Sequence, residues 1–232
     1  MQAIEVTKEM VPYIHYQRTK YYKNNFIFRL LTKLQKISLI FEKLKFLLFA
    51  NGIIRKFKKG IHAEFSLIEP YLPTDSQNVL DIGSGMAAVD ILISKHYGHK
   101  IDIHLLDKTM LDTDIYYGFK DKASFYNSFE LARKILTRNN VAEENIYTHD
   151  AGDLKDVFHN RKYDLVTSFI SWGFHYPIST YIKEVSDSMS DNGVLILDVR
   201  KDTDGLQEIK RYFKNTTIIH KTPFLDRVYA KK

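Results

Sequence analysis

The sequence predicts an α/β fold: a parallel sheet wound by crossover helices, closed by an antiparallel hairpin and preceded by a basic helical extension. The chain has 232 residues, 44% of them hydrophobic, which suffices for one α/β domain and an accessory segment. Short apolar runs alternate with helical stretches from Gln77 onward, the pattern of strands joined by crossover helices. The last two apolar runs are separated only by a short turn around Pro223, so they must pair antiparallel.

The N-terminal part has a different pattern, and we expect residues 1–73 to form a helical extension and residues 74–232 the main domain. Within residues 17–59, apolar positions alternate at spacings of three and four, as on one face of a long helix. Asn51-Gly52 predicts a cap or break in this helix. A second helical piece follows and ends before Pro70.

The positive charge of the chain is concentrated in this extension. Residues 1–60 carry 13 Lys and Arg against 3 Asp and Glu, so the remainder is slightly acidic despite the formal net charge of +6. A basic segment suits an anionic partner, such as nucleic acid, anionic lipid or a phosphorylated substrate, and it also suits a solvated helix face. The apolar stripe of residues 17–59 suits packing on the main domain, which we favour, and also peripheral membrane contact or a homodimer seam.

The main domain is predicted to contain seven strands and four helices. The strands are Asn78–Ile82, Ile101–Leu106, Asn145–His149, Tyr163–Phe169, Val194–Val199, Thr216–Lys221 and Arg227–Ala230. The helices are Ala88–His96, Ser124–Asn139, Ile178–Met189 and Gly205–Phe213. The first five strands are expected to run parallel, because helical stretches lie between most of them.

The sharpest local signal follows the first strand. The segment Asn78-Val-Leu-Asp-Ile-Gly-Ser-Gly85 runs from an apolar strand into a two-glycine turn, and a helix begins near Ala87. The glycines let a ligand approach the backbone closely, and the helix N-terminus offers unpaired N–H groups. Gly83, Gly85 and Ala88 also fit the G-x-G-x-x-A pattern of dinucleotide-binding proteins, which is a weak signal by itself.

Acidic residues at the ends of three successive strands distinguish between nucleotide classes. Asp81 lies two positions before Gly83, where a carboxylate suits a cationic group and repels a pyrophosphate. Asp107 closes the second strand, where it can accept both ribose hydroxyls, and Asp150 follows the third, where it suits an adenine amino group. Each could instead cap the helix that follows it. Together they predict a crevice for an adenosine with a positive, phosphate-free tail, which S-adenosylmethionine fits and NAD fits poorly.

Residues 77–230 resemble a class I S-adenosylmethionine-dependent methyltransferase. Residues 79–85 resemble its motif I, residues 105–107 motif II, His149-Asp150-Ala151 the adenine-binding turn, and residues 163–168 motif IV. The resemblance implies a Rossmann-like sheet of seven strands in the order 3-2-1-4-5-7-6, with the last strand antiparallel. It implies S-adenosyl-L-methionine as cofactor and S-adenosyl-L-homocysteine as product. The implied cofactor residues are Asp81, Gly83, Ser84, Gly85, Asp107, Lys108, Asp150, Ala151 and Ser168.

The segment after the fourth strand, Ser168-Phe-Ile-Ser-Trp-Gly-Phe-His-Tyr-Pro177, disfavours several methyltransferase classes. It lacks the Asn/Asp-Pro-Pro-aromatic motif of enzymes that methylate base amino groups, and the chain has no Cys for cytosine C5 methylation. Ser168 stands where catechol-type enzymes place a metal-binding carboxylate, so we expect no metal. Direct transfer to a hydroxyl then fits best, ahead of transfer to an amine or a carboxylate. His175, in the loop after this strand, is the predicted general base, with Asp198 in reserve.

Aromatic and polar side chains in two loops are the predicted acceptor contacts. They are Tyr117, Tyr126, Asn127, Trp172 and Tyr176. Residues 125–127 and 171–177 carry a weaker resemblance to small bacterial methyltransferases that modify sugars in glycan or lipopolysaccharide assembly. That resemblance implies a small-molecule acceptor, such as a nucleotide-, phosphate- or lipid-linked sugar.

Three other hypotheses stay open. One is an RNA or protein methyltransferase that uses the basic arm, with nucleic acid not favoured; another is an inactive methyltransferase-like binding module. The third is an NAD-dependent oxidoreductase, which Asp81 and the terminal hairpin disfavour. Because the chain has no Cys and the first twenty-five residues lack the pattern of a signal peptide, we expect a cytoplasmic protein.

Overall fold

The computed structural model describes residues 4–17, 39–108 and 128–232. The chain divides into two compact units, Met1–Glu64 and Phe65–Lys232. Helix α3 (Leu39–Ile68) contributes to both units, so the division falls inside a helix, nine residues before the boundary expected at residue 73. No helix within the described ranges is both long enough and apolar enough to cross a membrane.

The first unit contains α1 (Val11–Gln17) and most of α3. Helix α3 continues through Asn51-Gly52 without interruption, so the break predicted there is wrong. Gly52 is exposed, and the apolar stripe stays in phase across it, since Ala50, Ile53 and Phe57 are each 2% exposed. Burial of this stripe outweighs the cost of about 1 kcal/mol for a glycine inside a helix. Leu48, an apolar residue within the predicted stripe of residues 17–59, is 62% exposed.

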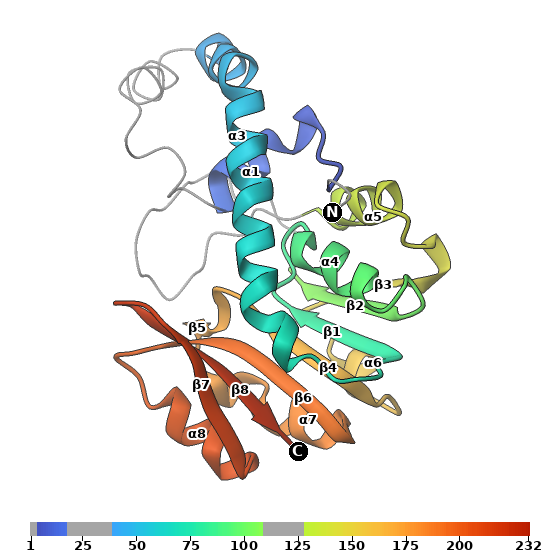
Figure 1. Ribbon diagram of the computed structural model, residues 1–232, viewed down its shortest axis with the longest axis vertical. Helices are drawn as coiled ribbons and strands as arrows, with labels where there is room; N and C mark the ends of the chain where they lie inside the picture. The colour runs from blue at the N-terminus through green and yellow to red at the C-terminus, as the bar shows by residue number, and fades with distance from the viewer. Residues whose placement is uncertain (1–3, 18–38, 109–127) are drawn as a thin grey trace. The chain divides into compact units, whose positions relative to one another are not determined.

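The second unit is built on one seven-stranded sheet in the order β3-β2-β1-β4-β6-β8-β7 (Figure 1). Counted along the chain within this sheet, the order is 3-2-1-4-5-7-6, and the last strand is antiparallel to both of its neighbours, which confirms the predicted Rossmann-like methyltransferase sheet. The strands are β1 (Asn78–Ile82), β2 (Asp102–Asp107), β3 (Ile146–Asp150), β4 (Tyr163–Ser168), β6 (Met189–Arg200), β7 (Asn215–Lys221) and β8 (Leu225–Lys231).

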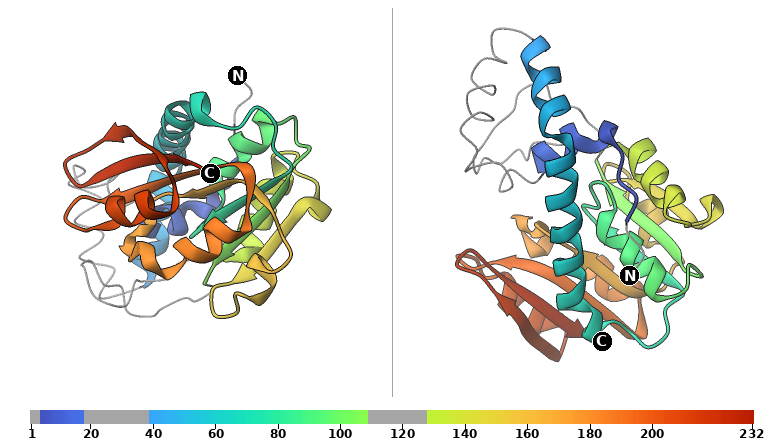
Figure 2. Two further views of the ribbon diagram at one scale, coloured as in Figure 1. Left: turned by 90° about the horizontal axis from the view of Figure 1, so that it is seen from below. Right: turned by 45° about the horizontal axis from the view of Figure 1, so that its top comes forward.

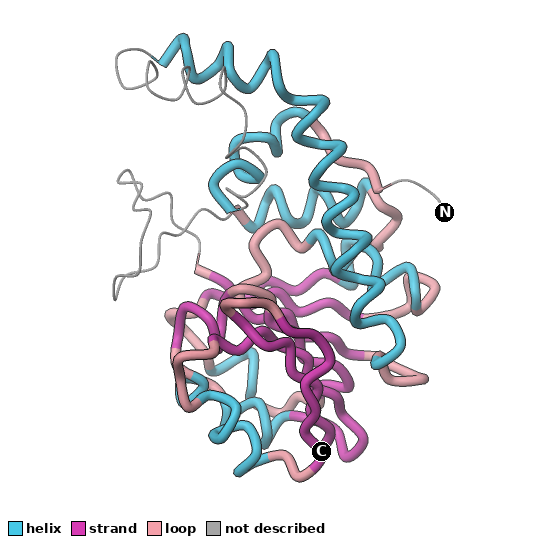
Figure 3. The backbone as a smooth tube through the Cα atoms, turned by 60° about the vertical axis from the view of Figure 1, so that its left-hand side comes forward, coloured by secondary structure: helices cyan, strands magenta, loops and turns pink. Residues whose placement is uncertain are grey.

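Helices cover both faces of this sheet (Figures 1, 2 and 3). One face carries α4 (Ala88–His96) and α5 (Phe129–Arg138), which contact each other; the other carries α6 (Lys155–Phe158), α7 (Ile182–Ser188) and α8 (Gly205–Tyr212). Alternate residues of β1 serve the two faces, as in any strand. Leu80 and Ile82 pack into the large core under α6, α7 and α8, and Asp81 points the other way, toward Asp90 of α4.

Two segments differ from the sequence prediction. Residues 171–176 form an extended segment, β5 (Ser171–Tyr176), where a loop was expected. The predicted helix 178–189 is interrupted at Tyr181, and β6 begins already at Met189, five residues before the predicted start of that strand. Both differences arise from tertiary packing, because β5 lies against β6 and Met189 pairs with Tyr163 of β4.

Candidate functional site

The turn between β1 and α4 is held in a shape that requires glycine. Gly83 and Gly85 have φ values of +76° and +57°, in the region that L side chains rarely adopt. A Cβ on Gly83 would overlap the side chain of Ser171, the first residue of β5. The Gly83 N–H donates to the Leu106 carbonyl at 2.7 Å, which fixes the turn to the end of β2. The turn is therefore packed on one side and leaves little room for any residue larger than glycine.

Asp107 ties the same turn to the neighbouring strand. Its Oδ2 accepts a 2.8 Å hydrogen bond from the Gly85 N–H, and its Oδ1 accepts one of 2.6 Å from the Lys108 N–H. A carboxylate oxygen carries two lone pairs and can accept more than one hydrogen bond. Asp107 pairs in register with Asp150, and the Ala151 N–H donates to the Asp107 carbonyl at 2.9 Å. The predicted ribose and adenine positions are thus adjacent in the structure.

Asp81 and Asp150 have different environments. Asp150 is exposed, and its Oδ1 accepts a 2.7 Å bond from the Gly152 N–H, which closes the turn after β3. Asp81 is 5% exposed and accepts a hydrogen bond of 3.1 Å from Thr167 Oγ1 on β4. Burial, followed by the charge of Asp90, raises the pKa of Asp81 well above the ordinary aspartate value. Asp90, which the sequence reading did not single out, therefore belongs to this site.

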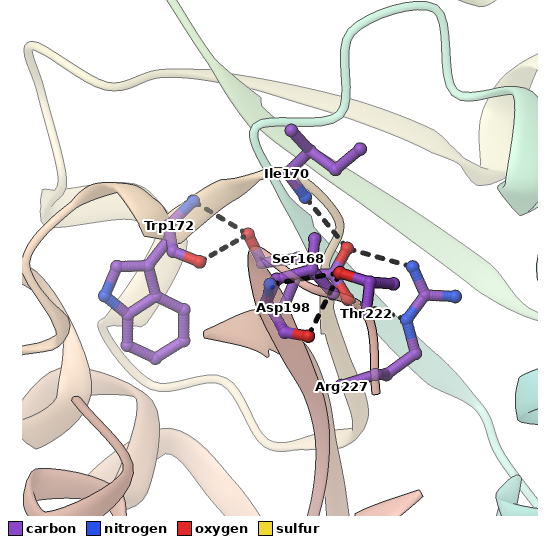
Figure 4. Close-up of polar contacts among 7 residues, drawn as sticks. Ser168, Ile170, Trp172, Asp198, Thr222 and Arg227 are labelled. Carbon is purple, nitrogen blue, oxygen red and sulfur yellow. Dashed lines mark hydrogen bonds and ion pairs between the residues drawn. The ribbon is translucent and has the colours of Figure 1, made fainter. Parts of the chain in front are cut away.

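Two hydroxyls of the predicted cofactor set are buried. Ser168 donates to the Ile82 carbonyl at 2.7 Å and accepts from the Trp172 N–H at 3.0 Å, so its hydroxyl joins β1, β4 and β5 (Figure 4). Ser84 is 9% exposed, and its hydroxyl has no hydrogen-bond partner among the residues that the structure places. A buried hydroxyl without a hydrogen-bond partner destabilises the fold unless a ligand or a water molecule forms a hydrogen bond with it. Ser84 is thus a better candidate for ligand contact than Ser168.

Asp198 and Trp172 are occupied by structural contacts. The Asp198 carboxylate is fully buried and holds Arg227 through bonds of 2.7 and 2.9 Å, so its geometry opposes the reserve role as general base (Figure 4). Trp172 is 0% exposed, and its indole N–H donates to the Ile178 carbonyl at 3.1 Å. It is a core residue, which opposes the expected place in an acceptor platform.

His175 and Tyr176 lie near the end of β5, a strand rather than the expected loop. His175 is exposed, with its ring 5.0 Å from that of Phe174. Desolvation and then the positive charge of Arg200 lower the pKa of His175 below the usual 6.5. Burial and then the charge of Asp107 raise the pKa of Tyr176, which places this phenol within electrostatic reach of the ends of β2 and β3.

Tyr181 is a site residue that the sequence reading missed. Its pKa is also raised, first by burial and then by the charge of Asp107. No local motif marks it, because its proximity to Asp107 depends on the course of the chain after β5. Tyr117, Tyr126 and Asn127, the other predicted acceptor contacts, lie outside the described residues.

His96, His99 and His104 lie close together in the sequence, but their side chains contact different partners. His99 bonds Ser94, His96 lies 3.7 Å from Glu69, and His104 bonds His149 at 3.0 Å. Across residues 4–17, 39–108 and 128–232, no three His, Cys, Asp or Glu side chains are grouped in a way that could hold a metal ion.

The arrangement of strands and helices is shared with solved structures. A proposed O-methyltransferase from Nostoc punctiforme PCC 73102 aligns with a TM-score of 0.54 at 15% identity, over 79% of this chain and 59% of that one. Cofactor-bound Rv0187 from MTB aligns with a TM-score of 0.51 at 14% identity, over 73% of this chain and 79% of that one. A methyltransferase from Pyrococcus furiosus aligns with a TM-score of 0.50 at 15% identity, over 74% and 82% of the two chains.

At these identities the likeness establishes the fold. The match spans less than two thirds of the length of the Nostoc protein. No protein-family model and no curated protein matches the sequence.

Proposed function

We propose that this protein binds S-adenosylmethionine and transfers its methyl group, without a metal, to a hydroxyl of a small molecule. The observation that carries the proposal is the hydrogen bond from the Gly85 N–H to Asp107, which joins the two-glycine turn after β1 to the acidic end of β2. In a doubly wound sheet, ligands bind at the carboxyl ends of the strands where the strand order reverses. Here that point lies between β1 and β4.

The residues at this point fit the cofactor. Gly83 and Gly85 add no side chain of their own to the turn, and the buried hydroxyl of Ser84, which has no hydrogen-bond partner among the described residues, lies in the same turn. Asp107 would accept the ribose hydroxyls, Asp150 and the Ala151 region would face the adenine, and Asp81 would face the ammonium of the amino-acid tail. When bound, S-adenosylmethionine supplies a methyl group activated by a positively charged sulfur. A pyrophosphate would meet three carboxylates at this edge, which supports the cationic cofactor over NAD.

His175 is the general base of the proposal. Its lowered pKa keeps the imidazole neutral at pH 7, the form that accepts a proton from an acceptor hydroxyl. Tyr176 stays protonated because its pKa is raised, so its phenol can donate a hydrogen bond to an acceptor oxygen. Positioning the acceptor hydroxyl in line with the methyl group would supply most of the remaining rate acceleration.

A sugar or glycan precursor is the acceptor that we propose. The support is the resemblance of residues 125–127 and 171–177 to sugar methyltransferases, together with the basic extension, which suits a phosphate-bearing acceptor. An RNA acceptor is the second candidate, supported by the exposed side chains of Arg55, Lys56 and Lys59 along α3. Binding to RNA should weaken steeply between low and moderate salt, whereas binding to a neutral sugar should not.

The first test is calorimetric titration with S-adenosylhomocysteine and with NAD. We expect S-adenosylhomocysteine alone to bind, with a dissociation constant on the order of micromolar. Asp107→Ala should weaken this binding by about 10- to 100-fold, since it removes hydrogen bonds to a charged group. Asp102→Ala, at the opposite end of the same strand, is the matched control and should bind normally. Binding of NAD alone would overturn the proposal.

A further inference from the structure

Two buried carboxyl groups face each other behind the two-glycine turn. Asp81 of β1 is 5% exposed and Asp90, in the first turn of α4, is 1% exposed. Their side chains lie within hydrogen-bonding reach of each other. Two ionised carboxylates within hydrogen-bonding distance of each other repel strongly when they are buried in the protein interior, because water is excluded there.

The surroundings of the pair offer it few hydrogen-bond donors. Within the described part of the chain, neither oxygen of Asp90 receives a hydrogen bond from an N–H or O–H group. Asp81 receives one, from Thr167 Oγ1 at 3.1 Å. The other charged groups that act on Asp81 are acidic, namely Asp90 and Asp107 of β2. A proton shared between the two carboxyls would relieve the repulsion between them.

We propose that Asp90 is a positioning residue that acts through Asp81: the two carboxyls share one proton, and the ammonium group of an incoming amino-acid tail displaces it. This inference rests on the proposed function, because the ammonium belongs to S-adenosylmethionine or S-adenosylhomocysteine. The bond that breaks is the carboxyl O–H, and its proton goes to solvent. The contacts that form are N–H···O hydrogen bonds from the ammonium to Asp81, whose charge is now complete.

The raised pKa values of the two carboxyls agree with this geometry. Burial raises the pKa of Asp90 from 3.8 to about 6, and burial together with Asp90 raises that of Asp81. The pair therefore keeps its proton in weakly acidic solution and loses it more readily as pH rises. A cation that needs both carboxylates ionised must bind more tightly as pH rises through the raised pKa at which the pair loses its shared proton. Coupling to one proton limits the gain to about tenfold per pH unit.

The test compares two probes that share the adenosine group. S-adenosylhomocysteine carries the ammonium, whereas 5′-methylthioadenosine carries the same nucleoside without the amino-acid tail. Calorimetry in two buffers of different ionisation enthalpy gives the number of protons released on binding. For the unmodified protein, measured at pH values between about 5.5 and 8, we expect S-adenosylhomocysteine to release up to about one proton and 5′-methylthioadenosine to release none.

Asp90→Asn is the decisive variant, since its amide can donate to an ionised Asp81 and needs no shared proton. We expect it to bind S-adenosylhomocysteine without proton release and with an affinity nearly independent of pH between about 5.5 and 8. Asp191→Asn, at an exposed position of β6, is the control and should behave as the unmodified protein. The control also accounts for any contribution of His175, which is present in every variant.

The outcomes separate this inference from the proposed function. Binding of S-adenosylhomocysteine without proton release, or equal release by Asp90→Asn, overturns the shared proton and leaves the methyltransferase proposal intact. Failure of both probes to bind overturns the proposed function and, with it, the displacement by ammonium. The shared proton has its own readout in the ligand-free protein. Relative to Asp90→Asn, its melting temperature should fall as pH rises through the raised pKa values of the pair, because a raised folded-state pKa stabilises only below that pKa.

Discussion

The guanidinium of Arg227 holds the carboxylate of Asp198 through two hydrogen bonds, of 2.7 and 2.9 Å, with side chains that are 5% and 0% exposed. The pair joins β6 to β8 in register and lies beside the turn that leads from β4 into β5. The Ile170 N–H donates to the same carboxylate at 3.2 Å, and the Phe169 ring lies 4.5 Å from the guanidinium carbon. Ile170 has a φ of +54°, a strained conformation for a β-branched residue, which these contacts help to hold.

Arg227→Met should destabilise the protein by about 3–5 kcal/mol, because it leaves the buried charge of Asp198 without a cationic partner. Urea unfolding measures the loss. Exchanging both partners, as Asp198→Leu with Arg227→Met, should recover much of it, since a matched apolar pair carries no unpaired charge. Lys183→Met breaks an exposed ion pair on α7 and should leave the midpoint unchanged. An equally small effect of Arg227→Met would show that the buried pair does not stabilise this edge of the sheet.

Gly83→Ala should abolish binding of S-adenosylhomocysteine and destabilise the fold by about 2–4 kcal/mol, since its Cβ overlaps Ser171 and its φ is positive. Gly98→Ala is the matched control, because Gly98 has a φ of +65° and open space around its Cβ. It should cost only the backbone strain, about 1–2 kcal/mol. Adding Ser171→Gly to Gly83→Ala should restore part of the lost stability. If the double variant is no more stable than Gly83→Ala, the overlap with Ser171 is not the cause of the loss.

His175→Gln should lower methyl transfer to an identified hydroxyl acceptor by about 100- to 10,000-fold while leaving S-adenosylhomocysteine affinity unchanged. In the unmodified protein, the rate should fall as pH drops through the lowered pKa of His175, because the protonated imidazole accepts no proton. The pH profile of kcat measures this directly. His220→Gln, on β7, is the control. Full turnover by His175→Gln would remove the assignment of the base and leave the cofactor site untouched.

Gly52→Ala should stabilise the protein by about 0.5–1 kcal/mol, since Gly52 lies inside a continuous helix and its Cβ would meet nothing within 4 Å. Thermal unfolding measures the gain. Gly98→Ala is the control and should lower the stability, because of these two glycines only Gly98 has a positive φ. Destabilisation by Gly52→Ala would instead support the helix break that the sequence predicts at Asn51-Gly52.

Local patterns were sufficient for much of the fold. The bounds of β1 and α4 match the predicted ranges, because an apolar strand, a glycine turn and a largely apolar helical run are each encoded by neighbouring residues. Strand β5 was not predictable in this way. Its packing depends on Gly173, where a Cβ would come within 2.9 Å of the Asp198 carbonyl, a partner 25 residues away in the chain.

The same limit applies to the site. The sequence located the carboxylates that end β1, β2 and β3, but it could not show that Asp198 is neutralised by Arg227 of a later strand. Asp90 carried a usable signal. It is an acidic residue flanked by Val89 and Ile91 in a helix that is buried almost all around. Acidic side chains are rarely buried unless they interact with a partner, so an acid at this position indicates a functional or structural contact.

The place of β8 sets the order in which the sheet can be completed. Strand β7 is made before β8, yet β8 is the neighbour to which it is bonded, and β8 lies between β7 and β6. During synthesis on the ribosome, β6 therefore presents an open, apolar edge until the chain has passed Lys231. A nascent chain arrested between β7 and β8 would be more prone to aggregate than one arrested before β6, and chaperone demand should concentrate in that short interval of translation.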